Sequence, residues 1–183
     1  MAAICTPDEV LRFWLEECGR DQWFRSSPEL DSQITARFRD THLALAGGAV
    51  ETWRASPEQR LAAIIVLDQF PRNIYRATPL AFATDPLALR EAKLAVDAGA
   101  DMAIDAAHRC FVYMPFEHSE VLAEQDRSVA LFAALGDEEY ADYALRHREV
   151  IAAYGRFPHR NAIVGRDSSA AELAYLAKPG AGF

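Results

Sequence analysis

The sequence contains few cysteines and few glycines. Its cysteines are odd in number and widely spaced, at Cys5, Cys18 and Cys110. No C-x-x-C pair occurs, so neither a disulfide framework nor a structural zinc site is expected, and the pattern fits a reducing cytoplasm. Only 9 glycines occur among 183 residues. Because glycine weakens helices, this scarcity, together with abundant alanine, favours helical structure.

Positive charge and long apolar runs are also scarce. Lysine and arginine number 19 against 27 aspartates and glutamates, which gives a net charge of -8 and a pI near 5.1. Duplex nucleic acid and anionic membranes require a dominant basic surface, so neither is an expected partner. No apolar run approaches the ~18 residues that would span a bilayer, and residues 1–9 lack the features of a secretion signal. We therefore expect a soluble, cytoplasmic protein.

Strand patterns are absent as well. No stretch alternates apolar and polar residues between turn residues, so little or no sheet is expected. Helix-start signals recur instead, each a capping residue followed by proline or by a glutamate three positions on, at Thr6, Ser27, Ser56 and Ser169. Apolar residues recur at helical spacing between short connections. The sequence predicts a single all-α domain over residues 1–183, built of stacked antiparallel helical hairpins.

The middle of the chain carries helix-stop signals that divide it. Residues 101–113 are predicted to form one helix, which Pro115 ends. A long helix is predicted to begin near Glu117 and to end at Gly136, and Asp137 would cap its successor.

Two stretches share the order Phe-Pro followed by Arg-Asn, and each is predicted to be a turn just past a helix. They are Asp68-Gln69-Phe70-Pro71-Arg72-Asn73-Ile74-Tyr75-Arg76 and Gly155-Arg156-Phe157-Pro158-His159-Arg160-Asn161. Guanidinium forks and side-chain amides suit a carboxylate or phosphate, and these turns offer Arg72, Asn73, Arg76, Arg156, Arg160 and Asn161. In the alternative interpretation, proline ends the helix, arginine favours its C-terminal dipole and asparagine bonds the turn backbone.

A third stretch, residues 113–120, reads Tyr113-Met114-Pro115-Phe116-Glu117-His118-Ser119-Glu120. His118 is the candidate general acid or base because its ordinary pKa lies near neutral pH, with Glu117, Glu120 or Asp68 to orient it. In the alternative, the glutamates favour a helix N-terminus and His118 packs in a polar pocket. His159 is the second candidate for proton transfer.

Motifs for nucleotides, metals and serine nucleophiles are missing. The sequence holds no glycine-rich phosphate loop, no G-x-S-x-G and no H-E-x-x-H. We expect no metal and no other cofactor.

In their order along the chain, the stretches 68–76, 113–120 and 155–161 resemble the bacterial uncharacterised family catalogued as domain of unknown function 924. The aromatic pairs Phe13-Trp14 and Trp23-Phe24 resemble that family's N-terminal pattern, and the resemblance covers nearly the whole chain. It implies a tetratricopeptide-like, right-handed superhelix of helical hairpins. It brings no established activity.

Three functions are compatible with these patterns. In the first, the three stretches converge on a pocket for a small anionic ligand, walled by Trp23, Tyr113 and Phe116. His118 or His159 would act as acid or base in hydrolysis of an ester or phosphate. In the second, a non-catalytic helical scaffold binds a peptide or a partner protein. In the third, the arginines and the acidic residues pair with one another and hold the hairpins in register. A monomer and a homodimer are both compatible with the sequence.

Overall fold

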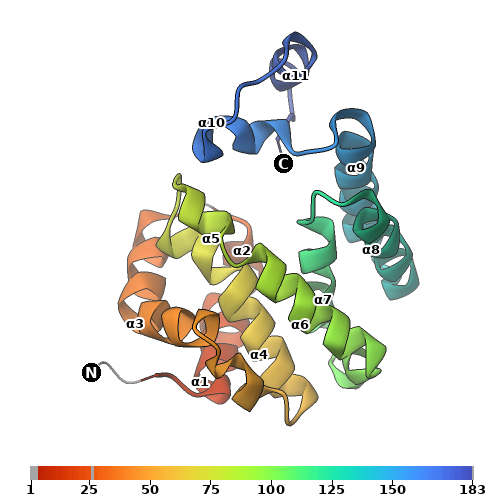
Figure 1. The fold of residues 1–183 in the computed structure, drawn as a ribbon. Helices are drawn as coiled ribbons and strands as arrows, with labels where there is room; N and C mark the ends of the chain where they lie inside the picture. The colour runs from red at the N-terminus through yellow and green to blue at the C-terminus, as the bar shows by residue number, and fades with distance from the viewer. Residues whose placement is uncertain (1–3, 26, 183) are drawn as a thin grey trace. The chain divides into compact units, whose positions relative to one another are not determined.

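In the computed structural model, which describes residues 4–25 and 27–182, every regular element is helical (Figure 1). Those residues contain no strand, and the predicted all-α class is confirmed. The chain packs as two compact units. Unit 1 comprises the described residues up to Arg76 together with Leu80–Pro115, and unit 2 comprises Ala77–Pro79 and the described residues from Phe116 onward. The single domain over residues 1–183 and the superhelical arrangement stay predictions.

Unit 1 is built from helices that surround α4. In chain order its elements are α1 (Pro7–Leu11), the π-helix η1 (Arg12–Cys18), α2 (Arg20–Trp23), α3 (Pro28–Ala46), the 3₁₀ turn η2 (Ala49–Trp53), α4 (Pro57–Asp68), α5 (Phe70–Ile74), the 3₁₀ turn η3 (Pro79–Phe82), α6 (Asp85–Asp97), the 3₁₀ turn η4 (Ala100–Ala103) and α7 (Ala106–Glu117). Pro79 of η3 and the last two residues of α7 belong to unit 2. Every residue from Leu61 to Phe70 is buried. The aromatic rings of Phe13, Trp14 and Phe38 gather on the ring of Phe70, at 4.8–6.3 Å between centroids.

Unit 2 begins with a helical hairpin. Its helices are α8 (Leu122–Leu135) and α9 (Glu138–Tyr154), followed by the 3₁₀ turn η5 (Pro158–Arg160), α10 (Asn161–Val164) and α11 (Ala170–Leu176). Gly136, at φ 80°, turns the chain between α8 and α9, and Asp137 caps α9 as predicted. Val150, Ile151 and Phe157 form a buried cluster, against which Tyr154 and Tyr175 pack.

The predicted helix starts are confirmed. Thr6 and Ser169 each accept a backbone N–H while the glutamate three positions on bonds back to the capping residue. The hydroxyls of Ser27 and Ser56 accept from the third residue of α3 and α4. These caps form because their partners lie within one turn, so the local sequence specifies them.

The predicted boundaries around Pro115 are wrong. Pro115 lies inside α7, which runs to Glu117, and α8 begins only at Leu122. Proline in the last turn removes one hydrogen bond from a helix whose inner residues are buried. The carbonyls at the helix end are satisfied by Gln125, whose amide donates to the oxygens of Glu117 and Ser119 at 2.6 Å each.

The single helix predicted over residues 101–113 is also wrong. The chain forms η4 first, and α7 starts at Ala106. Asp105 breaks the run because its carboxylate accepts the Ala107 N–H at 2.8 Å, which is a capping contact. Among the residues that the structure describes, no helix is both long and apolar enough to cross a bilayer.

Candidate functional site

The first Phe-Pro stretch continues as helix where a turn was predicted. Gln69 keeps helical angles, φ -85° and ψ -51°, and α5 follows at once. Pro71 falls in the first turn of α5, where a missing N–H costs nothing. Arg72 and Asn73 therefore project from a short helix, and Arg76 follows it.

Arg72 is enclosed by partners of unit 1. Its Nη1 donates to the Ala81 carbonyl, and its Nη2 lies 2.8 Å from Asp85 and 3.8 Å from Asp68. The guanidinium also stacks 4.8 Å from the centroid of the Phe82 ring. Two carboxylates balance its charge, and this arrangement favours the structural interpretation over a ligand anion.

Asp31 on α3 binds the other two polar residues of the stretch. Arg76 donates to both of its oxygens, at 2.6 and 2.7 Å, and the Asn73 amide donates at 2.8 Å. The hydrogen bonds from Arg76, with that from Asn73, hold the pKa of Asp31 below its ordinary value. These contacts join α3 to α5, and the sequence did not indicate Asp31 because it lies far from both residues along the chain.

Trp23 and Tyr113, both predicted to line the wall of a pocket, pack within unit 1. Trp23 donates from Nε1 to the Trp14 carbonyl at 2.7 Å and meets the Phe111 ring edge to face at 4.8 Å. Tyr113 is buried and donates to Asp101 at 2.8 Å. Burial and this carboxylate raise the pKa of Tyr113.

In unit 2, Arg156 and Asn161 also have structural partners. Arg156 donates to both Glu172 oxygens, at 2.6 and 2.8 Å, and Asn161 donates to Ser168 at 3.0 Å. Glu172 is also the capping glutamate of α11, and the hydrogen bonds from Arg156, followed by that from the Ser169 backbone, lower its pKa. These contacts connect the end of α9 to the start of α11.

A group of polar side chains in unit 2, centred on the buried Phe157 ring, contains the remaining candidates and one further histidine. We call this set the polar cluster: Glu117, His118, His147, His159 and Arg160. The His147 and His159 rings lie 5.6 and 5.4 Å from the Phe157 ring, and the Arg160 guanidinium lies 4.5 Å from its centroid. Glu117 joins the cluster through His147, 2.9 Å away, and His118 is the next residue along the chain.

His147 is the functional candidate that the sequence did not indicate. Its Nδ1 lies 2.8 Å from the Tyr143 carbonyl and 2.9 Å from Oε1 of the buried Glu117. Both neighbours are acceptors, so we assign the hydrogen to Nδ1. This hydrogen points to the backbone carbonyl of Tyr143. Oε1 of Glu117 therefore has no aligned donor among the described residues. The structure thus places the imidazole of His147 beside Glu117.

Glu120, a candidate to orient His118, has several hydrogen-bond partners in unit 2. It receives two hydrogen bonds from Arg166, at 2.7 and 2.9 Å, and one from the Phe157 N–H at 2.8 Å. Burial raises the pKa of Glu120, but these hydrogen bonds outweigh burial and hold the pKa below 4.5. Glu120 and Arg166 therefore anchor the backbone of Phe157.

His159 has the most perturbed imidazole of the cluster. Its pKa is lowered from 6.5 to about 4, mainly by burial and in smaller part by the charges of Arg160, His147 and His118, against an opposing contribution from Glu120. The C-terminal segment covers it: a Cβ on Gly182 would lie 3.0 Å from the His159 Cβ. His159 is accordingly neutral near pH 7.

Substitution of Gly182 by alanine is expected to uncover His159. Gly182 has φ +93°, where a side chain is strained, and its added Cβ would press on the imidazole. The segment must shift, so the pKa of His159 should rise from about 4 toward 6.5, as measured by an NMR pH titration. Gly165→Ala is the matched control, because Gly165 has φ +71° with no atom within 4 Å of its added Cβ. An unchanged pKa in Gly182→Ala would contradict this covering role.

Comparison with known proteins supplies a family. Residues 10–180 match the family described as bacterial protein of unknown function, DUF924. The chain belongs to this family. The structure of a protein of unknown function from Agrobacterium tumefaciens is similar, with a TM-score of 0.89 and 39% sequence identity, over 93% of this chain and 96% of that one. No curated protein matches. Since neither comparison names an activity, the function of this DUF924 protein has to be inferred from its side chains.

The described residues also limit the chemistry of the site. Within residues 4–25 and 27–182, no three His, Cys, Asp or Glu side chains are grouped in a way that would hold a metal ion. The polar cluster offers imidazole, guanidinium and carboxylate groups. These groups can bind an anion and transfer protons.

Proposed function

We propose that unit 2 binds the phosphate or carboxylate group of a small molecule at the polar cluster. The observation that supports it is the placement of the Arg160 guanidinium and of the His147 and His159 imidazoles on one buried ring, that of Phe157. Burial is the largest cause of the lowered pKa of His159, and the positive charge of Arg160 adds to it. That positive charge, which disfavours an added proton, favours an anion for the same reason. Arg160 is only 8% exposed, so water screens its charge weakly.

The chemistry proposed at this site is hydrolysis of an ester or phosphate by general acid–base catalysis. Neutral His159 accepts a proton, and the Glu117–His147 pair supplies a second imidazole oriented through its Nδ1. Hydrolysis of p-nitrophenyl acetate and p-nitrophenyl phosphate tests this step. A binding protein without catalysis would take up the same anion and hydrolyse neither compound.

Inorganic phosphate is expected to raise the pKa of His159 by about one unit or more, because a bound anion stabilises the imidazolium. An NMR pH titration with and without phosphate measures the change. In Arg160→Gln, the pKa of His159 should rise even without phosphate, since a repelling charge is lost, and phosphate should then have little further effect.

Arg148→Gln is the matched control for charge removal. Arg148 lies on α9 and pairs with Asp126 at 2.6 Å, with both side chains exposed. The Arg148→Gln substitution should leave the phosphate-induced change in the His159 pKa unchanged. If phosphate moves neither the His159 pKa nor the melting temperature, the proposal fails and the polar cluster is a structural network.

A further inference from the structure

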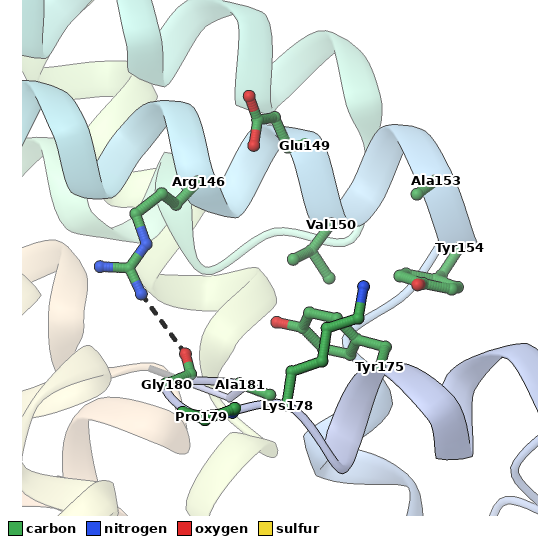
Figure 2. Close-up of a pocket in the computed structure, with 10 residues that line it drawn as sticks. All are labelled: Arg146, Glu149, Val150, Ala153, Tyr154, Tyr175, Lys178, Pro179, Gly180 and Ala181. Atoms are coloured by element: carbon green, nitrogen blue, oxygen red, sulfur yellow. Dashed lines mark hydrogen bonds between the residues drawn. The ribbon is translucent and has the colours of Figure 1, made fainter.

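Unit 2 contains a hollow that is separate from the polar cluster. It lies between α9 and the chain that follows α11, and its volume is about 290 Å³, near the lower end for small-molecule pockets (Figure 2). Its lining divides into an apolar part and a charged part: Val150, Ala153, Tyr154, Tyr175, Pro179 and Ala181 supply the first, and Arg146, Glu149 and Lys178 the second.

The two cations sit on opposite walls of this hollow. Figure 2 shows Arg146 reaching from α9 toward the Gly180 carbonyl, which it meets at 3.4 Å, and Lys178 extending from the other wall toward α9. The Lys178 ammonium makes no hydrogen bond or ion pair with any described residue. The carboxylate of Glu149 points away from these groups in Figure 2.

The apolar wall of the hollow suits a ligand whose apolar part is flat or compact. The Tyr154 and Tyr175 rings pack at 5.3 Å between centroids, and both lie on the core cluster of Val150 and Phe157. An aromatic or branched group placed against these two rings would bury apolar surface on a preformed wall. The lining carries two cations and one carboxylate, and Arg146 also lies 4.0 Å from Asp142 on the same helix. Positive charge is therefore limited, which matches a monoanion better than a dianion.

We propose that this hollow is a binding site for a small monocarboxylate with an aromatic or branched apolar body. Arg146 and Lys178 hold the carboxylate, and the two tyrosines contact the body. Benzoate is the probe, and benzamide, which has the same shape without the charge, is its neutral counterpart. Benzoate should bind at least about tenfold more tightly than benzamide, as expected when a charged group is lost from a hydrogen bond.

Two variants with matched controls test the location. Lys178→Gln should weaken benzoate binding about tenfold, whereas Arg148→Gln, on a part of α9 outside the lining, should not. Ala153→Phe fills the hollow and should abolish binding, whereas Ala152→Phe, at an exposed neighbour that does not line it, should preserve binding. Isothermal titration calorimetry of the full chain measures each affinity.

The alternative results overturn the proposal. Equal affinity for benzoate and benzamide would remove the role of the cations. Full binding by Ala153→Phe would place benzoate elsewhere. Loss of binding in Arg160→Gln with retention in Lys178→Gln would assign benzoate to the polar cluster, which leaves the proposed function standing while the second site fails.

Discussion

Replacement of Phe157 by alanine is expected to destabilise unit 2 by about 3–5 kcal/mol, the usual cost of deleting a buried aromatic ring. The ring is fully buried and packs with Val150 and Ile151. It is also the surface on which His147, His159 and Arg160 lie. Loss of the ring should therefore lower stability and disorganise the polar cluster together.

Urea unfolding measures the stability of the Phe157 variant, and NMR titration reports on the cluster. Leu173→Ala is the control, because Leu173 is 58% exposed and its truncation creates no cavity. Phe157→Leu should cost less than alanine, since it keeps much of the buried volume. If Phe157→Ala were no more destabilising than Leu173→Ala, the ring would not be the packing centre of unit 2.

Glu91→Gln is expected to destabilise unit 1 by about 3 kcal/mol at neutral pH, the low end of the range for breaking a buried ion pair. Glu91 is 2% exposed and receives hydrogen bonds from Arg54 at 2.7 and 2.8 Å and from Arg90 at 3.0 Å. Glutamine keeps the shape and removes the charge, so Arg54 loses its buried counter-charge and keeps only the exposed Glu51 at 3.6 Å. Glu17→Gln is the matched control: its pair with Arg37 is exposed, and little change is expected.

The same carboxylate makes stability depend on pH. Burial raises the pKa of Glu91, but hydrogen bonds from Arg54 and Arg90 outweigh burial, so the folded pKa lies below the ordinary value of 4.5. The contribution of Glu91 is then fully present above pH 4.5 and is lost as pH falls through the folded pKa. Denaturant titrations from pH 7 to pH 3 should show a shallower acid decline in Glu91→Gln than in the parent. Parallel declines would mean that Glu91 binds protons equally in both states.

Features set by neighbouring residues were predictable from the sequence. The capping contacts at Thr6 and Ser169 formed as expected because both partners lie within one helical turn. The all-α class followed from helical spacing and from the absence of alternating patterns, which are also local properties. The boundaries near Pro115 were not predictable, because the contacts that end α7 come from Gln125 on the next helix.

The sequence indicated which residue types the candidate site contains but not the partner of each residue. Arginines at the two Phe-Pro stretches were expected to hold an anion, yet Arg72, Arg76 and Arg156 are engaged by carboxylates of their own unit. His159 and Arg160 do lie together, because η5 places both beside Phe157. The anion site itself stays a prediction that the phosphate titration tests.

The sequence alone determined the helical class, the helix starts and the chemical groups available, since each depends on residues a few positions apart. Only the tertiary structure decided which group meets which: Asp31 with Arg76, Glu117 with His147 and Gly182 with His159. Such pairs are distant along the chain, and local spacing carries no information about them. Packing brings them together, and burial beside Arg160 then lowers the pKa of His159 to about 4, which no motif in the sequence indicated.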